Sequence, residues 1–312
     1  MPIKIPNDLP ASKILKEENI FVMDETRALS QRIRPLKLII VNIMPTKIVT
    51  ETQLLRLLSN TPLQIEVDWL CMESHNSKNT SQEHLMEFYK TFNEIKDNKY
   101  DGLIVTGAPV EKLKFEDVDY WNELTNIFDW ANTNVFSSFF ICWASQASLY
   151  YYYGVEKYQL KEKLTGVYHH HTNPEKMRRR ILRGFDYQFY APHSRYTSVK
   201  KEDMEKIDSL DILASSNDAG VYLVAEKDGS RFFVTGHPEY DPDTLDKEYH
   251  RDLAKGGDCV MPKNYYKNDD VNDEILVKWR SHAYLLFSNW LNYYVYQNTP
   301  YNLDDLLKMK TT

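Results

Sequence analysis

Strands and helices alternate along the first half of this chain, and this alternation restricts the fold more than any other feature. The run Leu36–Asn42 is almost continuously apolar, as expected for a parallel strand covered on both faces. Apolar residues at helical spacing follow between Lys47 and Ser59, and Leu63–Leu70 and Asp101–Gly107 are typical of further strands. Strands that alternate with helices require right-handed crossovers, so the sequence predicts a doubly wound α/β sheet.

The remaining elements are predicted from the same periodicities. Thr80–Glu83 has the composition of a capping box and begins a helix that we expect to continue to Ile95. A helix at Asp117–Ala131 and a strand at Phe136–Ile141 complete the first half. For the less regular second half we expect three short strands, the last two forming a hairpin around Asp228-Gly229, and two helices: Asp211–Ala214, Ala219–Ala225, Arg231–Thr235, Asp243–Ala254 and Glu274–Tyr294.

The chain contains no linker rich in Pro, Gly or Ser, so its 312 residues favour one large domain over two. Residues 1–35 lack a clear period and are predicted to form an N-terminal arm that wraps the body. Residues 36–300 form the single α/β domain, with elaborations toward its C-terminus, and residues 301–312 form a C-terminal tail.

Charge and cysteine content exclude several classes of protein. The net charge of −7 argues against a nucleic-acid platform, which needs a basic face. Met1–Pro6 does not have the composition of a signal peptide, and no apolar run approaches the ~18 residues that cross a bilayer. Three cysteines, Cys71, Cys142 and Cys259, form no Cys-x-x-Cys pair and suggest neither a disulfide framework nor a cysteine-rich zinc site. We therefore expect a cytoplasmic, reduced protein with no membrane or nucleic-acid partner.

Cys142 lies where the apolar strand ending at Ile141 runs directly into the start of a helix. A sharp strand-to-helix turn presents its central side chain above the sheet, which is the geometry of a nucleophile elbow. The free N–H groups of the helix N-terminus favour thiolate over thiol at such a position. On its own the same pattern also fits a small buried core cysteine.

A second motif, His237-Pro238-Glu239, follows the apolar strand at Arg231–Val234. His237 is a candidate general base for the thiol, and Glu239 is a candidate to orient its imidazole. The alternatives are a structural histidine at a strand end and a surface carboxylate. The pairing of a cysteine elbow with this motif favours covalent catalysis by Cys142.

Acyl chemistry at Cys142 would also need an oxyanion hole. The backbone N–H of Trp143, directly after the nucleophile, is one candidate donor. The second is predicted in the loop after the Asp101–Gly107 strand, at Gly107 and Ala108, although an ordinary turn would have the same sequence.

His169-His170-His171 suggests a metal site at first sight. Adjacent residues in an extended chain point to opposite faces, so only His169 and His171 could share one ligand set. No Asp, Glu or Cys lies at supporting spacing, so we predict no metal.

The combination of Cys142 with His237-Pro238-Glu239 resembles the class I glutamine amidotransferases, which carry a cysteine elbow and His-x-Glu on a flavodoxin-like sheet. Their elbow reads Gly-x-Cys-x-Gly, whereas this chain has Phe140 and Ala144 at the glycine positions. That departure argues against glutamine hydrolysis.

The chain as a whole resembles the homoserine O-acyltransferases of methionine biosynthesis built on this amidotransferase-like fold. The resemblance rests on separated blocks that occur in order: Arg34–Lys37, Leu55–Asn60, Asp101–Pro109, Cys142–Ala144, Pro192–Tyr196, Thr235–Tyr240 and Trp279–His282. It implies a ping-pong transfer from acyl-CoA to Cys142 and then to the hydroxyl of L-homoserine, with no metal or bound organic cofactor. The implied homoserine-binding residues are Lys163, Ser194 and Arg251, of which Lys163 and Ser194 are expected on loops.

Glu111 is the position that the resemblance connects with the acyl donor. Family members with glycine there use succinyl-CoA, and those with glutamate use acetyl-CoA. A second carboxylate ~4 Å from the succinyl carboxylate would cost on the order of 4 kcal/mol. The resemblance therefore implies acetyl-CoA as donor, with succinyl transfer as the alternative and a glutamine amidotransferase-like hydrolase or a non-enzymatic binding protein as more distant ones. A homodimer is left open.

Overall fold

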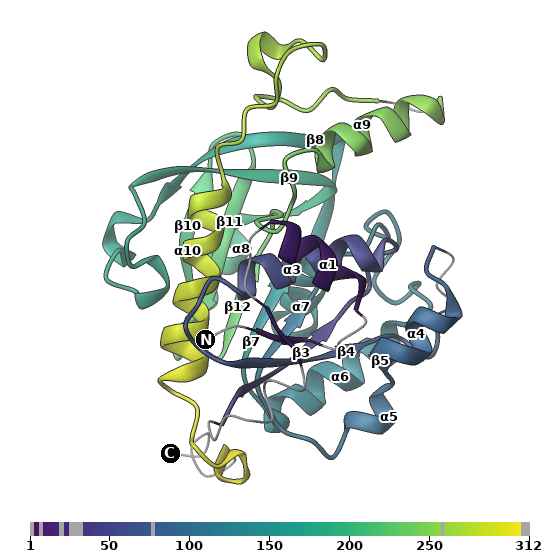
Figure 1. Cartoon of the computed structure of the whole chain (residues 1–312). Coiled ribbons are helices and arrows are strands. Elements are labelled where there is room, and N and C mark those ends of the chain that lie inside the picture. Colours follow the sequence, from purple (N-terminus) through teal and green to yellow (C-terminus); the bar gives the residue numbers. More distant parts are fainter. Residues whose placement is uncertain are drawn as a thin grey trace.

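The computed structural model describes residues 3–5, 9–18, 22–24, 34–75, 79–256 and 259–306. Its strands form one continuous sheet in the order β2-β1-β4-β3-β6-β7-β12-β11-β10-β8-β9, with β5 beside β4 (Figure 1). The strands span Ile3–Ile5 (β1), Val22–Asp24 (β2), Leu36–Val41 (β3), Ile65–Leu70 (β4), Tyr89–Lys90 (β5), Tyr100–Val105 (β6), Val135–Ile141 (β7), Lys157–Thr172 (β8), Gln188–Val199 (β9), Leu210–Ser216 (β10), Gly220–Glu226 (β11) and Arg231–Val234 (β12).

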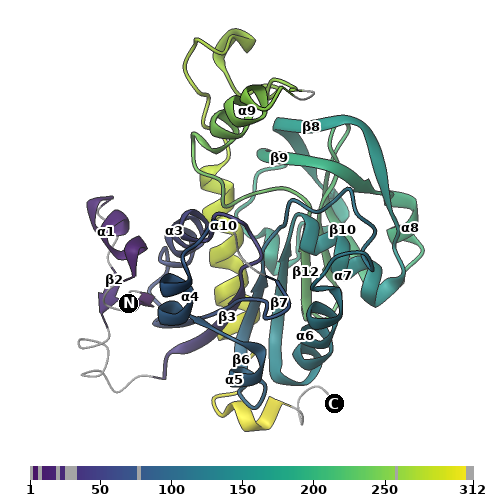
Figure 2. The same cartoon turned by 90° about the vertical axis from the view of Figure 1, so that its right-hand side faces the viewer.

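The parallel part of the sheet, β4-β3-β6-β7-β12, has the strand order of a flavodoxin-like, doubly wound fold. Helices cover both of its faces (Figure 2). Leu38 and Ile40 of β3 belong to the core beneath α3 and α10, whereas Ile39 and Val41 belong to the core beneath α6 and α7. The predicted fold is confirmed, and the continuous apolar runs reflect this burial on both faces.

The helices span Pro10–Glu17 (α1), Lys47–Leu58 (α3), Gln82–Phe88 (α4), Phe92–Ile95 (α5), Trp121–Asn134 (α6), Trp143–Tyr153 (α7), Lys201–Glu205 (α8), Thr244–Ala254 (α9) and Arg280–Trp290 (α10), the last continuing as a π-helical turn over Leu291–Tyr296. Within the described ranges, no helix combines the length and apolar character needed to cross a lipid bilayer.

The prediction of one helix from residue 80 to Ile95 is wrong. The helix begins after Ser81, whose side chain caps it, but it ends at Phe88. Tyr89 and Lys90 then pair with β4, and the Tyr89 hydroxyl donates to the buried carboxylate of Glu51. The capping box lies instead at Thr91 and Glu94, at the start of α5. Helix α10 likewise begins at Arg280, later than the predicted Glu274.

A long antiparallel hairpin, β8 with β9, was not predicted and forms one end of the sheet. It is inserted in the chain between β7 and β12, and β10 and β11 connect it to the parallel strands. Charged residues interrupt the apolar alternation in its first half, so its periodicity is weak in the sequence. The predicted C-terminal elaborations, α9 and α10, are also present.

The N-terminal segments extend the opposite end of the sheet. Strand β1 pairs in parallel with both β2 and β4, and α1 lies beside α3 (Figures 1 and 2). Leu15 of α1 is fully buried in the core beneath α3. This part of the chain therefore packs on α3.

Candidate active site

Cys142 occupies the turn between β7 and α7, as the elbow pattern predicted. Its backbone has a φ of 51° and a ψ of −115°, a strained conformation for a residue with a side chain. The surrounding structure holds this conformation: the Cys142 N–H donates to the Val234 carbonyl at 2.7 Å, and the Ser145 hydroxyl donates to the Cys142 carbonyl at 2.7 Å. Such strain costs about 1–3 kcal/mol and is usually stored where a side chain must be presented for chemistry.

His237 reaches Cys142 because β12 lies parallel and adjacent to β7, so both motifs leave the same edge of the sheet. The Nδ1 atom of the imidazole lies 2.7 Å from Oε1 of Glu239, and Cys142 is close enough to act on the same imidazole electrostatically. All three side chains are buried. The structure therefore brings the three candidate residues together, and we call Cys142, His237 and Glu239 the relay.

The electrostatics of the relay favour a charged imidazole. Burial alone would lower the pKa of His237, but the charges and hydrogen bonds of Cys142 and Glu239 raise it well above its ordinary value. The second carboxylate oxygen of Glu239 is buried without a hydrogen-bond partner among the described residues. Glu239 thus directs one oxygen at His237, the role expected of an orienting carboxylate.

Gly107 lies against both reacting side chains. A Cβ atom at this position would stand 3.2 Å from Cβ of Cys142 and 3.4 Å from Cε1 of His237, which is close packing that favours glycine. Ala108 follows it and is buried. Trp143 is the first residue of α7, where backbone N–H groups have no partner within the helix. The three candidate oxyanion-hole residues therefore lie at or beside the elbow.

Lys163, Ser194 and Arg251 come together although they lie on three different elements. We expected the first two on loops; instead Ser194 lies within β9, and Lys163 lies in β8 where its pairing with β9 is interrupted. The Lys163 ammonium lies 2.8 Å from Asp252, and the Arg251 guanidinium donates to the same Asp252 carboxylate. These side chains are held by carboxylates of α9.

Glu248 and Tyr240 were missed by the sequence analysis, yet they connect these residues to the relay. Glu248 accepts hydrogen bonds from the hydroxyls of Ser194, at 2.5 Å, and Tyr240, at 2.8 Å, and lies 3.6 Å from Lys163. The Tyr240 ring stacks on His237, with centroids 4.1 Å apart. The sequence held one indication of Glu248: it lies three and four residues before Arg251 and Asp252, a spacing that places the three side chains on one face of a helix.

Glu111 is partly buried in the loop after β6, and burial raises its pKa above the ordinary value. The charges of His237 and Lys163 oppose this shift, so the carboxyl group lies within electrostatic range of both side chains. Lys157 donates to the backbone carbonyls of Glu111 and Leu113 at 2.8 and 2.5 Å, which fixes the loop.

The three consecutive histidines alternate as the extended-chain argument predicted. His170 is buried and stacks on His193, whereas the rings of His169 and His171 lie together, 4.7 Å apart. Among the residues that the structure describes, no group of three or more His, Cys, Asp or Glu side chains has the arrangement of a metal site.

Solved structures with a similar fold include two glutamine amidotransferases. One, from Thermotoga maritima, superposes with a TM-score of 0.53 at 12% identity and covers 83% of this chain and 98% of that one. The other, from Methylobacillus flagellatus, has a TM-score of 0.51 at 10% identity and covers 83% and 95%. At this identity the likeness establishes an amidotransferase-like fold and nothing about activity.

Sequence relatives are far closer. A protein from Catenibacterium mitsuokai named homoserine O-acetyltransferase is 72% identical over 99% of this chain and 100% of its own length. Proteins of the same name from Petrotoga mobilis and Acetivibrio thermocellus are 60% and 59% identical, over 98% of this chain and 98% and 100% of theirs. The model of the homoserine O-succinyltransferase family matches residues 2–301, and this chain therefore belongs to that family.

Proposed function

We propose that this protein is an acyltransferase that moves the acetyl group of acetyl-CoA to the side-chain hydroxyl of L-homoserine, in methionine biosynthesis. Relatives that are 55–72% identical over nearly the whole chain are named for this reaction. The observation that carries the mechanism is the buried relay of Cys142, His237 and Glu239 at the ends of two adjacent parallel strands.

In the first half-reaction, His237 accepts the thiol proton and the Cys142 thiolate attacks the thioester carbonyl of acetyl-CoA. The C–S bond to CoA then breaks, and CoA leaves with the proton carried by His237. The N–H groups of Trp143 and of Gly107 or Ala108 are the proposed donors to the tetrahedral oxyanion. The product is an acetyl thioester on Cys142 and free CoA.

In the second half-reaction, His237 takes the proton from the homoserine hydroxyl, whose oxygen attacks the acetyl carbonyl on Cys142. The Cys142 C–S bond breaks, and the thiolate and the protonated histidine are restored together. Glu239 keeps Nδ1 protonated throughout, so that Nε2 is the nitrogen that exchanges protons with thiol and hydroxyl.

The acceptor is proposed to bind at the cluster around α9. Homoserine carries an ammonium and a carboxylate, and the cluster offers charges of both signs within one small region. Glu248 and Asp252 suit the ammonium, and Lys163 and Arg251 suit the carboxylate. The Ser194 hydroxyl, on β9, donates to Glu248. Two residues earlier on the same strand, the Pro192 carbonyl accepts from the backbone N–H of His237. Strand β9 therefore fixes the cluster relative to the general base.

Intact mass after mixing with acetyl-CoA alone tests the donor and the covalent step. We expect a single acetyl adduct in the natural protein and none in Cys142→Ala. Cys71→Ala and Cys259→Ala serve as matched controls, because both thiols are only partly buried and lie outside the relay. An adduct that persists in Cys142→Ala would refute the assigned nucleophile.

Succinyl transfer is the second candidate, because the matched family model carries the name of the succinyl enzymes. Glu111 favours acetyl, since a partly buried carboxyl group would face the succinyl carboxylate. Supplying acetyl-CoA and succinyl-CoA separately with homoserine distinguishes the two, and preference for succinyl-CoA would overturn our assignment.

We further propose that the protein acts in the cytoplasm, because both proposed substrates are metabolites of that compartment. We also propose that it needs neither a metal nor a bound organic cofactor. Acyl transfer through an activated thiol requires no such group. A homodimer remains a proposal that sedimentation at working concentration would test.

A further inference from the structure

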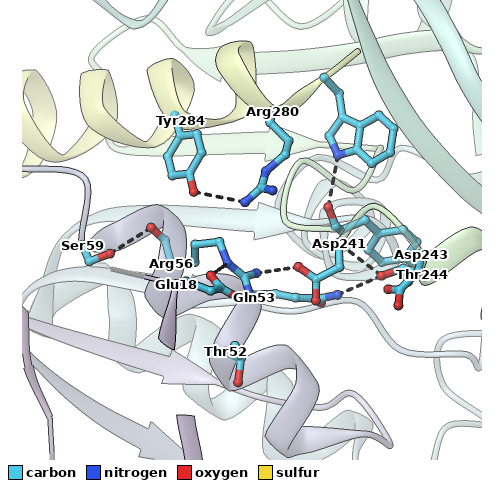
Figure 3. Close-up of polar contacts among 12 residues, drawn as sticks. Glu18, Thr52, Gln53, Arg56, Ser59, Asp241, Asp243, Thr244, Arg280 and Tyr284 are labelled. Atoms are coloured by element: carbon cyan, nitrogen blue, oxygen red, sulfur yellow. Dashed lines mark hydrogen bonds and ion pairs between the residues drawn. The ribbon is translucent and has the colours of Figure 1, made fainter. Parts of the chain in front are cut away.

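Arg56 of α3 joins the N-terminal helix to the segment that carries Glu239. Its Nε and Nη2 donate to both oxygens of Glu18, each at 2.5 Å, and its Nη1 donates to Asp241 at 2.5 Å. Figure 3 shows Arg56 between the two carboxylates, with Arg280 and Tyr284 of α10 beside them. These contacts span 38 residues to Glu18 and 185 residues to Asp241.

Arg56 is buried, whereas its two carboxylate partners are partly exposed. The Arg56 side chain is 7% exposed, and those of Asp241 and Glu18 are 24% and 35% exposed. Burial raises the pKa of Asp241, and Arg56 is the main group opposing that shift. Removal of Arg56 would leave two neighbouring carboxylates without their cation, whereas removal of either carboxylate would leave a single ion pair.

Three further hydrogen bonds involve the same segment. Gln53, one turn before Arg56 on α3, donates to the Thr244 hydroxyl at 3.0 Å, and the Asp241 N–H donates to that hydroxyl at 3.1 Å. The Trp279 indole donates to the Tyr240 carbonyl at 3.1 Å. Residues 240–244 are therefore anchored to α3 and to the start of α10.

The contacts of Arg56, Gln53 and Trp279 fix the positions of Glu239 and Tyr240. Glu239 hydrogen-bonds His237, and Tyr240 stacks on it and donates to Glu248. Asp241 follows them directly, so a shift of its backbone is passed to both. Reacting groups that move by as little as ~1 Å can lose about a hundredfold in rate.

We propose that Arg56 is a positioning residue for the reaction, which aligns the Glu239–Tyr240 segment with His237 by tying Asp241 to α3 and, through Glu18, to the N-terminal helix. The inference rests on the proposed function only for the identity of the acyl donor. The N-terminal helix is then part of the machinery that sets the rate, although it contributes no group to the relay.

The test compares Arg56→Gln, Arg56→Lys, Asp241→Asn and Glu18→Gln with the natural protein. Stopped-flow mixing with saturating acetyl-CoA gives the rate constant of Cys142 acetylation, and the amplitude gives the active fraction. We expect the rate constant to fall by about tenfold in Arg56→Gln and Asp241→Asn, because the relay is misaligned. Glu18→Gln should show a smaller loss in the same direction, and Arg56→Lys should restore part of the rate.

Glu17→Gln is the matched control, since Glu17 is the exposed neighbour of Glu18 at the end of the same helix. It should acetylate at the natural rate. A purely structural role for Arg56 would lower the active fraction and the melting temperature but leave the rate constant of the remaining active protein unchanged. An unchanged rate constant in Arg56→Gln and Asp241→Asn would overturn the proposal. An unchanged rate constant in Glu18→Gln would show that the N-terminal helix does not contribute to the positioning of the relay.

Alkylation of Cys142 by iodoacetamide separates this proposal from the proposed function, because it needs the Cys–His pair but no acyl donor. If the natural protein accepts no acetyl group, the proposed function fails, and the alkylation rates still test Arg56. We expect alkylation to slow in the same order of variants, and equal rates in all of them would refute the positioning role.

Discussion

Replacing Glu239 by Gln should slow the reaction of Cys142 with iodoacetamide near neutral pH without altering the fold. Glu239 and His237 are both buried and 2.7 Å apart, and Gln keeps the size and one acceptor oxygen while removing the charge. A charge-assisted hydrogen bond to a charged group contributes about 1.5–3 kcal/mol. Loss of this bond should lower the pKa of His237, because Glu239 is one of the two groups that raise it.

The sign of the effect follows from the ion pair. In the natural relay, the charges of Cys142 and Glu239 raise the pKa of His237 against the effect of burial. Loss of the Glu239 charge removes a charge-assisted bond of about 1.5–3 kcal/mol that supports the base, so the alkylation rate at pH 7 should drop by roughly 10–100-fold.

The assay is the second-order alkylation rate from pH 5 to 10, followed by mass and compared with Glu248→Gln. Glu248 lies near the relay but does not bond His237, so its loss should leave the alkylation profile close to natural while weakening homoserine binding. An unchanged profile in Glu239→Gln would refute the view that Glu239 maintains a charged imidazole.

Three further outcomes are expected. Glu111→Gly should shift donor preference toward succinyl-CoA, by up to nearly a thousandfold in relative kcat/KM if ~4 kcal/mol of repulsion is relieved. Glu111→Gln removes the charge but keeps most of the volume, so it shows whether repulsion or lack of space excludes the succinyl group. Unchanged selectivity in both variants would exclude Glu111 from the acyl pocket. Arg251→Ala should raise the KM for homoserine by about tenfold or more and leave that for acetyl-CoA unchanged, and equal effects on both would assign Arg251 to the fold. His170 is buried, and burial lowers its pKa to about 3, so its contribution to stability is present above pH ~6.5 and is lost as pH falls from there toward 3. Urea unfolding at pH 7 and pH 5 should therefore show a loss of about 2 kcal/mol from this group, and a His170→Gln variant whose stability falls equally steeply with acid would contradict it.

Several parts of the site followed from local sequence alone. The apolar runs of β3, β6 and β7 predict parallel strands. Cys142 directly follows one of them, and His237 lies shortly after the apolar strand at Arg231–Val234, so the two motifs suggested a Cys–His pair. The parallel pairing of β12 with β7 that brings them to one edge was not predicted. Local chemistry sufficed here because strand periodicity, the elbow and the His-Pro-Glu spacing all lie within short windows of sequence.

Other parts were decided by tertiary structure. The hairpin of β8 and β9 depends on pairing between segments with weak alternation, and that pairing brings Ser194 and Lys163 to α9. The break at Tyr89 also depends on partners elsewhere, since its hydroxyl bonds Glu51 while its backbone extends β4. Local propensity cannot reveal these features, because the stabilising contacts are distant along the chain.

The charged network shows the same limit most clearly. Composition identifies Arg56, Glu18 and Asp241 only as polar residues that would ordinarily face solvent. Arg56 is nevertheless buried, because three segments meet there and its charge finds two carboxylate partners. The sequence by itself determined the parallel strands of the first half, the elbow and the candidate reacting groups. Tertiary structure decided which carboxylates and cations surround those groups, because the free energy of a buried charge depends on neighbours that only the folded chain supplies.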